Sequence, residues 1–376
     1  MKYRLNEPYI KGKEKEYVND VIDSGWLSVN GKHTKEFERQ FAEMVGVKYA
    51  MAVQSGTAAL HTALLALGIK EKSRVAVPNY TCAANVSTIL QCNAIPRILD
   101  IEKDTFGLDA DGLEKLIEKE YIDAAMLVHV YGFPARDTER IVDICKKNNV
   151  LLLEDAAEAH GAEYKGKKCG SFGDMSIFSV RSEKMIGVGE GGLVLSDNKS
   201  LMDKAYYWAA RAAPKRGNNY PYWYQYYYSG VGMNYLMPHI LGAIGRGQIE
   251  NFPEILKRKR AVGEKYHSLL KNIEGIETQK KIPESNPSYW LNIALMKDKS
   301  ESEVRDIGLK MMDKGIEIRP AFWPLDNQEV FKPYACTEGK NAKYLFEKGL
   351  ILPSSVYLDE KSIDFIVKEF RGIYGK

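Results

Sequence analysis

Cysteine is scarce in this sequence, and it has no marked excess of charge of either sign. The five cysteines are scattered and form no Cys-x-x-Cys pair, which argues against a disulfide framework or a zinc site and fits a reducing compartment. Lysine and arginine (53) exceed aspartate and glutamate (50) by only three, so charge gives no case for a nucleic-acid or membrane partner. No apolar run approaches the roughly 20 residues of a membrane span, and the N-terminus has no apolar signal core. We therefore expect a cytoplasmic chain without a metal.

Short apolar runs alternate with amphipathic helical stretches from about residue 45 onward. Runs without polar alternation occupy residues 48–53, 74–78, 95–100, 124–130 and 150–155. Such runs, joined by helices, are typical of parallel strands that are buried on both faces. The repeated strand–helix unit predicts a doubly wound α/β fold, whose ligands sit at the carboxyl ends of the strands.

The pattern changes in the last third of the chain. We expect one long helix within residues 241–272, then a strand at 288–296 and a closing helix at 362–374. A chain of this length suggests two domains. We predict a large domain over 1–245 and a smaller α+β domain over 246–376, with the N-terminal segment able to pack on the small domain.

The stretch SGTAAL (55–60) follows a predicted strand and opens a predicted helix. The first N–H groups of a helix lack partners inside it, so those of Gly56 and Thr57 can bind an anion, aided by the helix dipole. The alternative is an ordinary helix cap with no ligand.

Asp155 ends the apolar strand VLLLED (150–155). A buried carboxylate is costly unless a cation or a hydrogen-bond donor compensates it, and one at this place could keep a pyridinium nitrogen protonated. The alternative is that Asp155 caps the next segment. Glu158 and His160 follow closely, and His160 is either a satisfied buried imidazole or a support for Asp155.

Lys184 lies in SVRSEKMIGVGEGG (179–192), between two apolar runs. Ser179 ends the first run, where it could donate to a phosphate. A desolvated lysine near another cation such as Arg181 loses its proton more easily, as a Schiff-base lysine must. The alternative is a surface hairpin. Taken together, an anion-binding helix start, a strand-end aspartate and a strand-end lysine are the parts needed to bind pyridoxal phosphate.

The chain resembles the sugar aminotransferases of the DegT/DnrJ/EryC1/StrS group, including the perosamine synthase-like enzymes. The resemblance spans nearly all of the sequence. It is carried, in family order, by segments such as DSGWLSVNGKH, QSGTAALHTALLALGI, HVYGFPA, EDAAEAHGAEYKGKKCGSFGD, MNYLMPHILGAIGRGQIE and LPSS. It implies the aspartate aminotransferase architecture of fold-type I enzymes, with a mainly parallel sheet and pyridoxal 5'-phosphate (PLP) as cofactor in the large domain.

The resemblance also implies residue roles. Lys184 would form the Schiff base with PLP and shuttle a proton, Asp155 would pair with the pyridine nitrogen, and Glu158 would lie near the ring hydroxyl. The phosphate would be held by Gly56, Thr57 and Ser179, with Asn234 supplied by the neighbouring subunit of a homodimer. The substrate would contact Trp26, Ser28, Arg181, Glu183 and Arg319.

Several positions depart from the family pattern. Cys82 stands where an aromatic residue usually stacks on the cofactor, so either the thiol packs on the ring or another residue such as Tyr80 replaces the stack. Leu236 replaces the arginine of the cross-subunit Asn-Tyr-Arg motif. Arg181-Ser182-Glu183 replaces the usual segment before the lysine. These changes point to an unusual substrate, and Arg181 and Arg319 could bind an anionic group of it or form salt bridges instead.

The aromatic segment at residues 220–235 is expected to pack on a partner or a domain seam, or else to stack on the substrate. The resemblance implies transfer of an amino group from L-glutamate to a keto sugar. That sugar would be a nucleotide-linked 4-keto-6-deoxyhexose or a keto sugar acid such as an 8-keto octulosonate, used for aminosugars or lipopolysaccharide. The alternatives are a sugar dehydratase, whose family members have histidine in place of the lysine, and a non-catalytic regulator, which should carry a DNA-binding extension.

Overall fold

A seven-stranded sheet forms the centre of the molecule in the computed structural model, which describes residues 1–213 and 226–375. The strand order is β1-β9-β8-β5-β4-β2-β3. The bounds are β1 Tyr49–Val53, β2 Arg74–Pro78, β3 Ile95–Leu99, β4 Ala124–Val128, β5 Leu151–Asp155, β8 Met175–Ser179 and β9 Gly192–Ser196. Only β9 runs against its neighbours β1 and β8, and the other paired strands are parallel. The expected α/β fold with a mainly parallel sheet is confirmed.

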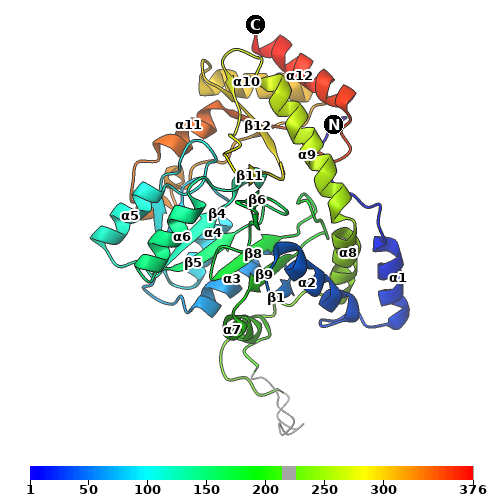
Figure 1. Cartoon of the computed structure of the whole chain (residues 1–376), viewed down its shortest axis with the longest axis vertical. Coiled ribbons are helices and arrows are strands. Elements are labelled where there is room, and N and C mark those ends of the chain that lie inside the picture. The colour runs from blue at the N-terminus through cyan, green and yellow to red at the C-terminus, as the bar shows by residue number, and fades with distance from the viewer. Residues whose placement is uncertain (214–225, 376) are drawn as a thin grey trace.

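Helices cover both faces of this sheet (Figure 1), which explains the unbroken apolar runs. Along β4 and β5, Met126 and Leu153 join the larger core on one face, whereas Leu127 and Leu152 pack with α5 and α6 on the other. Successive strand residues point to opposite faces, so both sets must be apolar. The helices of this part are α3 Gly56–Leu67, α4 Ala84–Gln91, α5 Ala110–Lys119, α6 Thr138–Lys147 and α7 Lys199–Ala209.

The C-terminal part forms a second sheet, antiparallel and of order β10-β12-β14-β13, with its own apolar core. The strands are β10 Ile276–Glu277, β12 Asn292–Met296, β13 Arg319–Pro320 and β14 Gly349–Leu352. The helices are α10 Glu301–Asp313, α11 Lys340–Lys348 and α12 Glu360–Tyr374. A small three-stranded sheet joins β6 Glu163–Tyr164, β7 Lys167–Lys168 and β11 Ser285–Asn286.

The single long helix expected within 241–272 is wrong, because two helices occupy this region. Helix α8 (His239–Glu250) ends before Asn251, and α9 (Phe252–Leu270) begins after it. Pro253 lies in the first turn of α9. A proline has no N–H and its ring clashes with the turn before it, so it fits the start of a new helix and cannot continue the old one.

The N-terminal segment lies beside the C-terminal part, although helices α1 (Glu14–Ser24) and α2 (Lys32–Val45) pack on α8 (Figure 1). The backbone N–H groups of Lys2 and Tyr3 donate to the carbonyl of Gly315, and that of Ser354 donates to Leu5. These contacts bring residues 2–5 next to the second sheet. Within the described residues, no helix combines the length and apolar character needed to cross a membrane.

Candidate active site

A cavity of about 380 Å³ opens at the carboxyl ends of the parallel strands. The ends of β1, β5 and β8 meet there, together with the start of the reversed strand β9, because Val53 pairs with Gly192. Nine of the residues predicted from the sequence line it: Gly56, Thr57, Cys82, Asp155, Glu158, Ser179, Arg181, Glu183 and Lys184. Sheet topology therefore brings together side chains that are up to 128 positions apart (184 − 56).

The start of α3 forms one end of the cavity. Ser55 caps the helix, and its Oγ accepts a hydrogen bond from the N–H of Ala58 at 3.0 Å. The N–H groups of Gly56 and Thr57 precede the first intrahelical bonds and face the same end of the helix. A Cβ added to Gly56 would lie 3.0 Å from the Cβ of Ser179. The absence of a side chain at Gly56 lets the helix start approach Ser179 closely without crowding, which produces a compact group of donors suited to an anion.

Two buried carboxyl groups also line the cavity. Asp155 accepts from the N–H of Ala157 at 2.9 Å, and Glu158 accepts from the N–H of Tyr131 at 2.9 Å. Burial raises the pKa of Asp155, and the N–H of Ala157 opposes that rise. Burial also raises the pKa of Glu158, and the charge of Lys184 opposes it. Both carboxyls therefore gain from any cation or N–H donor placed in the cavity.

Lys184 points inward. Its Nζ lies 3.3 Å from Glu158 Oε1 and 3.5 Å from the centre of the Trp290 ring. Its side chain is only 11% exposed, which excludes the surface-hairpin interpretation. The loop that carries it connects β8 to β9, and the N–H of Lys184 donates to the carbonyl of Arg181 at 2.8 Å. The amine is thus held at the cavity wall between a carboxylate and an aromatic face.

His160 is fully buried against Phe41 and Phe178. Within the described residues neither ring nitrogen forms a close hydrogen bond, although the backbone of Ser179 interacts with the ring and raises its pKa, so the interpretation as a satisfied buried imidazole stays a prediction. Burial, together with the charge of Lys184, lowers the pKa of His160 to about 3. The ring is therefore neutral at physiological pH.

Glu183 joins the two arginines that were predicted to contact the substrate. Its carboxylate lies 3.4 Å from Arg181 and 3.8 Å from Arg319. Arg181 also pairs with Glu190 at 3.2 Å, and Arg319 with Glu317 at 3.4 Å. Of the two alternatives left open by the sequence, salt bridges are therefore present at both arginines. Arg319 lines an adjoining cavity of about 310 Å³ that shares Glu183 and Trp290 with the first.

Asn234, Ser28 and Trp26 lie elsewhere. Asn234 and Ser28 line a separate pocket of about 670 Å³, together with Tyr206 and Arg211. Trp26 is 56% exposed next to it, and its indole N–H donates to the carbonyl of Val29 at 3.2 Å. Within one chain, these three side chains do not line the cavity that holds Lys184.

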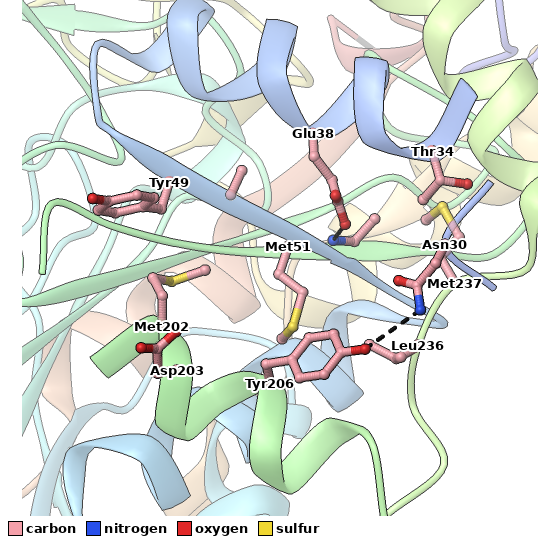
Figure 2. Close-up of a pocket in the computed structure, with 12 residues that line it drawn as sticks. Asn30, Thr34, Glu38, Tyr49, Met51, Met202, Asp203, Tyr206, Leu236 and Met237 are labelled. Atoms are coloured by element: carbon pink, nitrogen blue, oxygen red, sulfur yellow. Dashed lines mark hydrogen bonds between the residues drawn. The ribbon is translucent and has the colours of Figure 1, made fainter. Parts of the chain in front are cut away.

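Figure 2 shows a fourth pocket, which adjoins the one that contains Asn234 at Asn30, Tyr206 and Leu236. Sulfur atoms of methionines line it, and the Tyr206 hydroxyl accepts from Asn30 Nδ2 at 3.4 Å. The carboxyl of Glu38 accepts from the N–H of Ala52 on β1, and burial raises its pKa to about 7. Glu38 thereby satisfies a backbone donor at the edge of the sheet, which is a structural role.

Tyr80 does not replace the missing aromatic stack. It is fully buried behind the cavity, where its hydroxyl shares a hydrogen bond of 2.9 Å with that of Tyr131. Cys82 reaches the cavity. The aromatic residues that line it are Trp290 and Phe322. Sequence reasoning assigned neither of them, nor did it assign Asn85, which also lines the cavity. The motifs Ser-Tyr-Trp and Arg-Pro-Ala-Phe-Trp contain the two aromatics and were the available signals.

Part of the tyrosine-rich segment, residues 220–225, lies outside the described residues. Of the remainder, Tyr226, Tyr227 and Tyr228 are 78%, 56% and 43% exposed. They follow α7 in the chain, and the N–H of Ser229 returns to the carbonyl of Ala212. These three rings are thus largely open to solvent in the described part of a single chain, and their packing on a partner or a domain seam, or their stacking on a substrate, stays a prediction.

One buried group in the described part of the chain has the side chains of a metal site: His129, Glu154 and Cys169. His129 Nδ1 accepts from the N–H of Ala135 at 3.0 Å, so its Nε2 donates to Glu154 at 2.9 Å. Glu154 also accepts from the N–H of Phe172 at 2.7 Å. These bonds already explain the His129–Glu154 pair as a structural support one residue before Asp155.

Comparison with known proteins shows similarity to one enzyme family along nearly the whole chain. The sequence profile of the DegT/DnrJ/EryC1/StrS aminotransferase family matches residues 8–371. GDP-perosamine synthase of Escherichia coli O157:H7 is 35% identical over 375 residues, which cover 100% of this chain and 99% of that protein.

Two further proteins link the likeness to a cofactor. A Bacillus subtilis protein with the provisional name pyridoxal phosphate-dependent aminotransferase EpsN is 33% identical, covering 96% of this chain and 92% of its own. The solved PMP form of Spr1654 from Streptococcus pneumoniae, provisionally named a sugar aminotransferase, superimposes with a TM-score of 0.90 at 25% identity. It covers 99% of this chain and 97% of its own.

Proposed function

The chain belongs to the DegT/DnrJ/EryC1/StrS aminotransferase family and is a PLP-dependent sugar aminotransferase, and we propose that it transfers an amino group from L-glutamate to a keto sugar at the cavity that contains Lys184. The observation that carries the proposal is the position of the Lys184 amine, 3.3 Å from Glu158 in a cavity that also holds Asp155. The sugar would be a nucleotide-linked 4-keto-6-deoxyhexose or a keto sugar acid, used for aminosugars or lipopolysaccharide.

The side chains of the cavity fit PLP. The start of α3 and Ser179 offer donors for a phosphate, in a cradle that a Cβ at Gly56 would crowd. In the same cavity, burial raises the pKa of Asp155, and a cationic partner would stabilise the charged form of this carboxyl. Asn85 lines the same cavity with a buried, unpartnered Oδ1. An elongated group with an anionic end and a protonated ring nitrogen would satisfy these residues.

When bound, PLP supplies an electron sink that allows an amino group to pass between an amino acid and a keto compound. Gly56, Thr57 and Ser179 would hold its phosphate. Asp155 would stay ionised and keep the ring nitrogen protonated. Lys184 would hold the aldehyde carbon through Nζ and, once released by the amino donor, move a proton at that atom. Glu158, which contacts Nζ, would keep the amine in the cavity.

A second subunit would complete the site. Asn234 and Ser28 share a pocket away from Lys184, on a side of the chain where Leu27 is 53% exposed. Single exposed apolar residues are ordinary, but a group beside a pocket indicates an interface. We therefore propose a homodimer in which Asn234 of one chain helps to bind the phosphate in the other. Trp26 and Ser28 would contact the sugar from the same side.

The carboxylate of Glu183 and the guanidinium groups of Arg181 and Arg319 would contact the substrate at the outer part of the cavity. Because each arginine already pairs with glutamates, an anionic substrate group would compete with those carboxylates. On binding, each arginine would therefore exchange a glutamate for the anionic group of the substrate, and neither guanidinium would wait unpaired in the empty site.

The test is a panel of keto sugars with L-glutamate or L-glutamine as donor, followed by detection of the matching product, 2-oxoglutarate from glutamate or 2-oxoglutaramate from glutamine. We expect glutamate to support amination of a keto sugar by the wild-type protein and the Lys184→Ala variant to give none. Acceptance of simple 2-oxo acids with no sugar turnover would contradict the substrate class. Wild-type rates in Lys184→Ala would contradict the role of the lysine.

A further inference from the structure

Lys259, in α9, is fully buried and takes no part in the chemistry proposed above. Burial lowers the pKa of its amine to about 7. A methionine would fill a similar volume without placing an ionisable group in the interior. The contacts of the amine must therefore compensate the cost of its burial.

The Lys259 amine donates to three oxygen atoms of neutral groups. They are the carbonyl of Trp290 at 2.6 Å, the carbonyl of Ser354, and Asn6 Oδ1 at 3.4 Å. In its charged form the amine has three N–H donors, and this set of acceptors uses all of them. The acceptors come from three distant segments: the N-terminal segment, the residues before β12 and the turn after β14. The amine ties these segments together from behind the cavity.

Two of the same residues hold the backbone next to the candidate catalytic lysine. Asn6 Nδ2 donates to the carbonyl of Glu183 at 2.5 Å, and the indole N–H of Trp290 donates to the same oxygen at 2.7 Å. Since the Oδ1 of Asn6 faces Lys259, its NH₂ must face Glu183. The lysine thus sets the orientation of the amide that supports the loop.

The series of contacts that starts at Lys259 reaches the Lys184 amine through Trp290. Trp290 is held through its carbonyl by Lys259 and through its indole N–H by the backbone of Glu183. Its ring centre then lies 3.5 Å from Lys184 Nζ. A shift of Trp290 would move an aromatic face that stabilises the charged form of that amine.

We propose that Lys259 is a positioning residue of the active site. It holds Asn6 and Trp290 against the backbone of the loop that carries Lys184, and so determines where the Lys184 amine lies. This inference rests on the proposed role of Lys184 and adds a residue that does not touch the cavity.

The test uses the PLP-loaded enzyme and follows the pH at which the visible absorption band of the bound cofactor changes. Lys259→Met removes all three donated bonds, and Asn6→Leu removes only the link through the amide. We expect the midpoint pH to fall by about one unit in Lys259→Met, which is a tenfold change in the protonation equilibrium. The reason is that the displaced Trp290 ring no longer stabilises the positive charge on the Lys184 nitrogen. The kcat should fall while KM changes little. Lys265→Met, on the same helix and paired with Asp364 at 2.9 Å, is the control and should leave both unchanged.

A double variant decides whether Lys259 acts through Asn6. If it does, Lys259→Met combined with Asn6→Leu should shift the midpoint less than the sum of the two single shifts. A wild-type midpoint and kcat in Lys259→Met would overturn the proposal. If that variant does not fold, a wild-type midpoint in Asn6→Leu would overturn it instead.

A Lys184→Ala variant separates this proposal from the proposed function. If its visible band titrates as in the wild type, the role of Lys184 is wrong and the positioning role falls with it. If that band is lost in Lys184→Ala but the Lys259 variants behave as wild type, only the positioning role is wrong.

Discussion

At the scale of single residues, the environment of Lys184 distinguishes it from a surface lysine and supports the catalytic role proposed for it. The charge of the side chain is balanced by Glu158 and by the face of Trp290. The sequence places Asp155 and Ser179 at strand ends, because apolar runs stop there. It could not place Trp290 beside Lys184, since 106 positions (290 − 184) separate them and no local pattern reports such a contact.

Asp155→Asn should reduce turnover by about a hundredfold or more, because the neutral amide cannot balance a protonated ring nitrogen. The folded apoprotein should be no less stable, since the amide is nearly isosteric and the cost of burying a charge disappears. Steady-state rates and thermal unfolding of the apoprotein measure the two effects. Asp326→Asn is a control outside the cavity, where Asp326 accepts from the N–H of Gly339 at 3.1 Å. Equal turnover in Asp155→Asn and the wild type would contradict the assignment.

His160 should make the protein less stable in acid. Its pKa is about 3 in the folded chain against an ordinary value of 6.5, so between these values only the unfolded state binds the proton. Stability therefore falls as pH decreases from about 6.5 towards 3. From pH 7 to pH 5 the loss from this group is about 2 kcal/mol. Urea unfolding of the apoprotein should show that His160→Met loses less stability over this range by about that amount, and parallel pH profiles would refute the prediction.

At the scale of secondary-structure elements, the strand–helix alternation was sufficient to predict the sheet and its functional edge. The strands of the large sheet lie on apolar runs that are visible in the sequence, because strands buried on both faces leave such runs, but the runs do not report that β9 is antiparallel to its neighbours. The break between α8 and α9 was missed because amphipathic periodicity continues across Asn251. Only the proline that follows marks the new helix.

The start of α3 should tolerate no side chain larger than that of glycine. Gly56→Ala places a Cβ 3.0 Å from the Cβ of Ser179, which should separate the two parts of the anion site and weaken PLP binding about tenfold or more. Equilibrium titration of the apoprotein with PLP measures this affinity. Gly372→Ala, in α12, meets no atom within 4 Å and should stabilise the chain by about 0.5–1 kcal/mol without changing PLP affinity. Unchanged affinity in Gly56→Ala would exclude this helix start as the phosphate site.

At the scale of the whole molecule, one chain accounts for the cofactor cavity but leaves Asn234, Ser28 and Trp26 in a different place. The family resemblance predicted a neighbouring subunit for Asn234, and its distance from the cavity supports that proposal. Intrachain packing alone could not have suggested it, because an interface between copies leaves only exposed apolar groups in a single chain. The boundary between domains at residue 245 remains a prediction.

Leu27→Asp should weaken the proposed homodimer. The substitution puts a charge into an apolar surface that the second copy would cover. Because each copy contributes the same residue, two charges would lose their contact with water when the dimer forms. Sedimentation velocity should show a larger monomer fraction together with lower turnover at low protein concentration. Tyr121→Asp is a matched change at a residue that is 68% exposed after α5, and it should leave the dimer intact. A wild-type sedimentation profile in Leu27→Asp would place the interface elsewhere.

The central claim is that Lys184 is the residue that holds PLP, and peptide mapping after borohydride reduction tests it most directly. Reduction makes the link between a lysine amine and PLP permanent, so mass spectrometry of the digested protein locates the lysine that carried it. We predict a pyridoxyl group on the peptide that contains Lys184 and none in Lys184→Ala. A pyridoxyl group on another lysine in the wild type, with Lys184 unmodified, would contradict the account.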